Sequence, residues 1–209
     1  MELTAEEGRV LGCLVEKQLT TPQQYPLTEN ALLAACNQST SREPVVAYDV
    51  GTVRLAVREL RAKELVRTVH RPGERSEKHR HLLEESLGLT TGEQVVLALL
   101  LLRGPQTAAE LRARGERMHA FAGQQDVEDV LASLADRDEP LVEPLSRQPG
   151  QKGARYADAV VATGPPQVTL RLVPEAAPDE VPDLADEVRA LRAEVAALRE
   201  EVAALRRPD

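Results

Sequence analysis

The sequence predicts a mainly α-helical α+β protein with two tandem winged-helix domains and a C-terminal coiled-coil helix. Helix-capping signals stand before apolar stripes of helical spacing, and short β-branched segments follow them. The same order of signals begins again at Leu89, and a repeat of this length indicates a duplicated domain. The expected parts are a first winged-helix domain at 1–87, a second at 88–161, a Pro-rich linker at 162–182 and a coiled-coil helix at 183–207.

Three helices are expected in the first domain. Thr4 and Glu7 have the spacing of a capping box, in which each side chain satisfies a backbone donor of the other residue. Thr28 and Asp49 are expected to cap the second and third helices. The stripes expected to face the core are Val10, Leu11, Leu14 and Val15, then Leu32, Leu33 and Cys36, then Val53, Val57 and Leu60.

The second domain repeats these signals. Thr90 with Glu93 and Thr107 with Glu110 again have capping-box spacing, and Asp126 is expected to cap the third helix. The apolar positions expected to face its core are Val95, Val96, Leu99, Leu100, Leu111, Val127, Val130, Leu131 and Leu134.

Each set of three helices is followed by a predicted hairpin, which completes the winged-helix order. In the first domain, residues 65–70 and 79–83 are expected to pair across a turn. In the second, 141–145 and 155–161 are expected to pair across a loop that contains Gly and Pro.

The last segment has the pattern of a parallel two-stranded coiled coil. Val at a and Leu at d favour dimers, and Glu at g faces Arg at e of the partner only in a parallel pair. The positions are Leu184, Val188, Leu191, Val195, Leu198, Val202 and Leu205 in the seam, with Glu187, Glu194, Glu201, Arg192, Arg199 and Arg206 beside it. The sequence therefore predicts a homodimer, and the alternative is a solvated helix folded back on its own chain.

Composition limits the kinds of partner. The net charge is −8 and aromatic residues make up 2%. So few rings argue against binding single strands by base stacking. Residues 49–81 nevertheless hold nine basic and five acidic side chains, and they form the one clearly basic stretch.

That basic stretch predicts contact with double-stranded DNA. Arg54, Arg58 and Arg61 are expected to share the outer face of the third helix, where Arg can contact guanine or phosphate in the major groove. The residues expected to contact phosphate from the hairpin are Arg67, Arg71, Arg75, Lys78 and Arg80. The alternatives are a solvated helix that pairs with acidic residues such as Glu59 and Glu64, or a surface for an acidic protein.

The second domain differs in charge. Its third helix is expected to expose Glu128, Asp129 and Asp136, and carboxylates that face phosphate weaken binding. We therefore expect this domain to contact protein rather than DNA. The leading hypothesis is a dimeric DNA-binding protein that regulates transcription, and the rival is a protein-interaction scaffold. A third hypothesis is a small-molecule sensor with its ligand between the repeats.

No catalytic, metal or cofactor site is expected, because enzyme motifs and a closed zinc ligand set are missing from the sequence. His70, His79 and His81 are expected to add to a basic hairpin instead. Cys13 and Cys36 are expected to be buried free thiols in a reducing compartment. Because the start of the sequence has no signal-peptide pattern and the apolar runs are too short for a membrane span, a soluble cytoplasmic protein is expected.

The loops after the first and second helices, at 23–27 and 38–45, have residues that are unusual for simple connecting segments. Asn37, Gln38, Arg42 and Glu43 could bind a ligand or partner, or they could tie the loop to its own domain, which is the interpretation we favour.

Several short contiguous segments of the sequence resemble the YceH-like family of uncharacterised bacterial proteins. They are found at residues 14–18, 20–22, 24–27, 35–38, 42–45, 100–104, 106–107 and 110–112, and at Arg117, Met118 and Phe121. The resemblance covers roughly residues 1–160. It implies a tandem winged-helix fold, and it supplies neither an activity nor catalytic residues.

Overall fold

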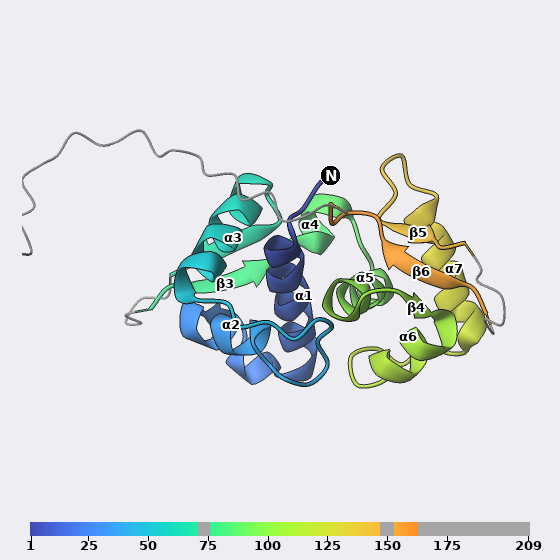
Figure 1. Ribbon diagram of the computed structural model, residues 1–209, viewed down its shortest axis with the longest axis horizontal. Coiled ribbons are helices and arrows are strands. Elements are labelled where there is room, and N and C mark those ends of the chain that lie inside the picture. Colours follow the sequence, from blue (N-terminus) through green and yellow to red (C-terminus); the bar gives the residue numbers. More distant parts are fainter. Residues whose placement is uncertain (71–75, 147–152, 163–209) are drawn as a thin grey trace, which may run out of the picture. The chain divides into compact units, whose positions relative to one another are not determined.

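The described residues of the chain form helices and two small antiparallel sheets (Figure 1). The computed structural model describes residues 1–70, 76–146 and 153–162, and about half of these residues are helical. The predicted linker beyond Ala162, the heptad helix, Arg71 and Arg75 lie outside the described residues. An α+β class is thus confirmed, while the coiled coil and the domain boundaries stay predictions.

The first half of the described chain, residues 1–87, contains a helix, a short strand, two helices, a hairpin and a final short helix. The elements are α1 (Ala5–Thr20), the 3-10 turn η1 (Pro22–Gln24), β1 (Leu27–Thr28), α2 (Glu29–Cys36), α3 (Val50–Ala62), β2 (Val66–Val69), β3 (Lys78–His81) and α4 (Leu83–Leu87). The sheet has the order β1-β3-β2, and both pairings are antiparallel.

The second half, residues 88–162, repeats that order. Its elements are α5 (Thr91–Arg103), β4 (Gln106–Thr107), α6 (Ala108–Gly115), α7 (Gln124–Ala135), β5 (Val142–Pro144) and β6 (Arg155–Asp158). Its sheet has the order β4-β6-β5, again antiparallel. The repeat seen in the sequence is therefore a repeat of structure.

The predicted helix caps are present at five of the six expected positions. In the capping box of α1, Thr4 N donates to Glu7 Oε2 at 2.7 Å and Glu7 N donates to Thr4 Oγ1 at 3.2 Å. Equivalent boxes open α5 and α6, and side-chain caps precede α2 and α3. The expectation for Asp126 is wrong. α7 begins earlier, after Gly123, and the Asp126 carboxylate in its first turn accepts from Ala122 N at 2.9 Å.

The other differences from the expected elements involve only a few residues each. The two-residue strands β1 and β4 were not expected, because two residues carry no periodicity and their pairing depends on β3 and β6. The second strand of the first hairpin ends at His81, and Leu83 already begins α4.

The core lies along α1 and α5, which pack against each other (Figure 1). Both helices bury side chains on several faces, and α5 is buried from Gly92 through Leu102. Leu3 N donates to Val160 O at 2.7 Å, so the start of the chain is bonded to the end of the second half. The two halves therefore share one continuous core. None of the described helices is long and apolar enough to cross a membrane.

Candidate nucleic-acid interface

The outer face of α3 carries the three arginines that were predicted to share it. Val53, Ala56, Val57 and Leu60 are buried, so the opposite face of the helix is turned to solvent. Arg54 and Arg58 expose 68% and 69% of their side chains, and Arg61 is also exposed. The structure therefore brings Arg54, Arg58 and Arg61 together on one accessible helical surface.

Two of these arginines have carboxylate partners. Arg54 Nε and Nη2 donate to the two oxygens of Glu29 at 2.9 and 2.8 Å. Arg58 Nε and Nη2 both donate to one oxygen of Glu59, at 3.2 and 3.0 Å. Glu59 was named in the alternative of a solvated, paired helix, but its partner Arg58 is the adjacent residue and not one a helical turn away. Glu29 was not foreseen because it lies on α2. An exposed single-oxygen pair such as Arg58–Glu59 is worth about 0–1 kcal/mol, so a phosphate or a base can compete for that guanidinium, whereas the bidentate contact with Glu29 holds Arg54 more firmly.

The hairpin places further basic side chains in register. Arg67 on β2 lies directly opposite Arg80 on β3, so both project from the same face of the sheet. Arg67 is exposed, while Arg80 donates to Glu85 Oε1 at 2.6 Å. Lys78 is on the same face as Arg80 because side chains two residues apart share a face. Arg67, Lys78 and Arg80 thus lie on one face of the hairpin that follows α3.

The expectation that His79 and His81 add charge to this hairpin is wrong. Both lie on one face of β3, as the spacing predicted, but that face is buried, with exposed fractions of 6% and 5%. Burial lowers the pKa of His79, and the charge of Arg61 lowers it further, although Glu77 and Glu29 oppose this. Burial also lowers the pKa of His81 to about 4. Both rings are therefore neutral at neutral pH.

His81 is expected to make the fold less stable in mild acid. Because its folded pKa of about 4 lies below its ordinary value of 6.5, the unfolded chain binds more protons between these values. Stability is therefore present above pH 6.5 and is lost as pH falls toward 4, by about 2 kcal/mol between pH 7 and pH 5. Urea unfolding at the two pH values measures this loss. His81→Gln should lose less than the wild type, and equal losses would contradict the assignment to His81.

The surface equivalent to α3 in the second half is acidic, as predicted. Asp129 on α7 and Asp136 just after its end are exposed, and Glu128 is half-buried. Gln124 and Gln125 donate to Glu128 and Asp129 at 2.7 and 2.9 Å. Arg137 is turned to Leu87 O and does not offset these charges on the helix face. This surface is a poor match for phosphate.

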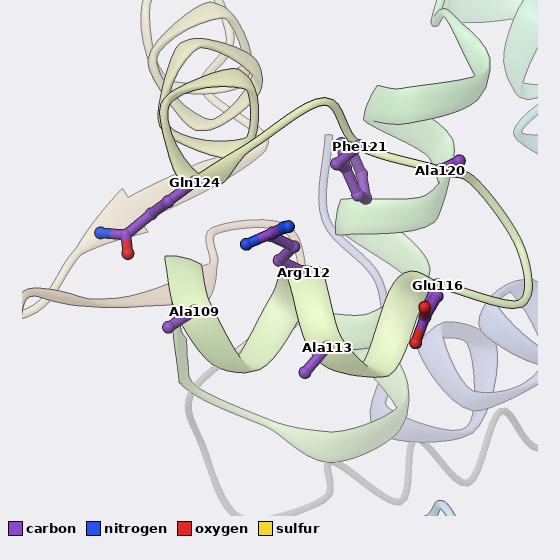
Figure 2. Close-up of a pocket in the computed structure, with 7 residues that line it drawn as sticks. All are labelled: Ala109, Arg112, Ala113, Glu116, Ala120, Phe121 and Gln124. Carbon is purple, nitrogen blue, oxygen red and sulfur yellow. The ribbon is translucent and has the colours of Figure 1, made fainter.

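A shallow hollow of about 290 Å³ lies beside α6, next to the segment that leads into α7 (Figure 2). Arg112 and Ala113 lie on α6 and Glu116 directly follows it, Phe121 comes from the connecting segment, and Gln124 begins α7. The hollow lies within the second half, so it is not the site between repeats that a small-molecule sensor would need.

The loop between α2 and α3 is bonded mainly to its own half, and Glu43 N also donates to Leu102 O of α5 at 2.8 Å. Asn37 Nδ2 donates to Tyr48 O, and Asn37 Oδ1 accepts from Tyr48 N, both at 2.8 Å. Arg42 is buried and donates to both oxygens of Glu16. These bonds confirm the interpretation that the loop residues hold the loop in place, and that role leaves Asn37 and Arg42 few atoms for a ligand.

The two thiols lie between α1 and α2, both fully buried and free. The Cys36 thiol donates a hydrogen bond to Cys13, and this bond together with burial raises the pKa of Cys36, so this thiol is protonated. Among the described residues, no group of three or more His, Cys, Asp and Glu side chains has an arrangement that could hold a metal ion.

Fold and surface together define an α+β protein of two similarly ordered halves, one of which exposes an arginine-bearing helix. The chain belongs to the family described as "Protein of unknown function, DUF480", whose model matches residues 3–151. A UPF0502 protein of Pelobacter propionicus is 54% identical over 157 residues, 75% of this chain and 71% of the relative. UPF0502 proteins of Koribacter versatilis and Klebsiella pneumoniae are 48% and 47% identical over 160 residues, covering 76% and 74% of this chain and 74% of each relative. The resemblance to an uncharacterised bacterial family is confirmed, and these names assign no activity.

Proposed function

We propose that this protein is a dimeric winged-helix protein that binds double-stranded DNA and regulates transcription. The order of elements in each half supports the winged-helix assignment, because three helices are followed by a hairpin whose second strand pairs with a short strand between the first two helices. In such a helix-turn-helix arrangement, α2 crosses the DNA backbone and α3 enters the major groove.

The observation that carries the proposal is the exposed face of α3. Arg54, Arg58 and Arg61 are exposed there, on the helix that the element order assigns to recognition. Arg67 and Lys78 lie on the outer face of the following hairpin, where they can contact backbone phosphates. The equivalent helix α7 is acidic, so each chain offers one reader. The predicted parallel coiled coil would then supply two readers, which suits a two-fold operator with half-sites about one helical turn apart.

Replacing Arg54, Arg58 and Arg61 together with Ala should abolish binding to random-sequence duplex DNA at physiological salt. Each lost phosphate contact should also reduce the slope of log affinity against log salt by about one. Fluorescence anisotropy of the full chain at low and physiological salt measures both quantities.

The matched control replaces Arg112, Arg114 and Arg117 with Ala. It removes the same charge from an exposed surface of the second half. If binding depends on α3, this control binds nearly as the wild type does. Equal losses in both triple variants would show that net charge governs binding, and the recognition role of α3 would then be rejected.

A second candidate function is a protein-interaction scaffold, which the acidic face of α7 and the net charge of −8 favour. A stoichiometric partner recovered from a cell lysate after nuclease treatment, and lost with Asp129→Lys, would support it. Either function is proposed as non-enzymatic. A cytoplasmic location is proposed because a reducing compartment keeps Cys13 and Cys36 as thiols.

A further inference from the structure

Arg54 is held in a way that leaves its outer end unoccupied. Glu29 accepts from Nε and Nη2, which together form the side edge of the guanidinium. Among the described residues, Nη1 of Arg54 has no acceptor, so the end formed by Nη1 and the second hydrogen of Nη2 stays available. The side chain is therefore fixed along one edge while its other edge projects into solvent from α3, where 68% of it is exposed.

From this geometry we infer that Arg54, held by Glu29, reads a guanine base in duplex DNA. The inference rests on the proposed function and names the ligand of one side chain. The N7 and O6 atoms of guanine present two acceptors in the major groove, and they match the two donors at the end of a guanidinium. A phosphate offers acceptors as well, but it is an anion and would be placed near the Glu29 carboxylate, which repels it.

Glu29 is a positioning residue in this scheme. Its hydrogen bonds with Arg54 lower its pKa, so its carboxylate is ionised at neutral pH and holds the guanidinium. Fixing a long side chain before binding reduces the entropy lost when the base is contacted. By contrast, Glu59 engages Arg58 through a single oxygen from the adjacent position in the same helix, so it does not fix both side-edge donors to separate acceptors.

A second feature of α3 also fits contact with bases. Two of the exposed large apolar side chains in the described chain, Val50 at 39% and Leu55 at 51%, lie on this helix. Leu55 directly follows Arg54, and an apolar side chain gains nothing from a phosphate. The C5-methyl group of thymine is an apolar partner in the same groove. The α3 face therefore combines a fixed guanidinium with an exposed leucine, a combination suited to base edges.

The test is a selection of duplexes from a random library with the full-length protein, followed by affinity measurements. The wild type should enrich sites with a guanine whose replacement by adenine weakens binding about tenfold or more. Arg54→Ala should lose that discrimination. Glu29→Gln should lower it several-fold, while its affinity for random duplexes stays equal or rises because a negative charge is removed. Glu59→Gln removes the same charge from α3 itself and should keep the preference.

Three results would overturn the inference. One is a Glu29→Gln variant that binds all duplexes more tightly with its base preference unchanged, since Glu29 would then merely reduce the charge. Another is an Arg54→Ala variant that weakens binding equally on every duplex, which would make Arg54 a phosphate contact and leave the proposed function standing. Failure of the wild type to bind any duplex at low salt would reject both the inference and the proposed function.

Discussion

Replacing Arg42 with Met is expected to lower the free energy of unfolding by about 3–5 kcal/mol, because it leaves a largely buried carboxylate without its main partner. The Arg42 side chain is fully buried, and Glu16 exposes 14% of its side chain. Arg42 Nη1 and Nη2 donate to the two Glu16 oxygens at 3.1 and 2.7 Å. Although burial opposes ionisation, these bonds hold the pKa of Glu16 below its ordinary value. Chemical denaturation with urea measures the change.

The same substitution also removes donors from backbone acceptors. Arg42 Nε donates to Ala35 O at 3.1 Å and Nη1 donates to Ser41 O at 2.8 Å. A second variant that also changes Glu16 to Leu should recover part of the loss, since no buried charge remains unpaired. Arg112→Met, at an exposed position on α6, should change stability by less than about 0.5 kcal/mol. A loss in Arg42→Met no larger than in this control would contradict the assigned role of the buried pair.

The helices were predictable because their signals are local. A capping box spans four residues, and the stripes behind Thr4, Thr90 and Thr107 repeat with the helical period. Each helix signal gained support because the same order of signals occurs in both halves of the sequence. Asp126 shows the limit of such reasoning, because a carboxylate can stabilise a helix from its first turn as well as from the cap position.

The candidate interface was predictable only in part, because its details depend on tertiary packing. The spacing of Arg54, Arg58 and Arg61 predicted a shared face, which α3 has. The partner of Arg54 is Glu29, which lies 25 positions away in the sequence and is brought near by the packing of α2 on α3. Alternation along β3 likewise predicted that His79 and His81 share a face, but the choice between the core and the solvent face is fixed by strand pairing.

The second large effect is expected at Gly12, where α1 approaches α5. A Cβ atom on this residue would lie 2.9 Å from Leu102 Cγ and 3.3 Å from Ala98 O, closer than carbon atoms normally pack. Leu102 is 1% exposed, so it has no solvent to move into. We therefore expect Gly12→Leu to lower the free energy of unfolding by about 3 kcal/mol. Gly12→Ala should cost less, since the higher helix propensity of Ala, worth about 1 kcal/mol, offsets part of the strain.

Gly92→Ala is the matched control, because it makes the same change in a buried position of α5. Its Cβ atom would meet neighbours no closer than 3.5 Å, an ordinary contact. This variant should be neutral or more stable by up to about 1 kcal/mol, as helix propensity predicts. If Gly12→Ala were stabilised as Gly92→Ala is, α1 and α5 would have room to separate at this point. A large loss of stability in Gly12→Leu, together with a single unfolding transition, would instead mean that the core shared by the two halves unfolds as one unit. The helices α3 and α7 would then belong to one cooperatively folded body.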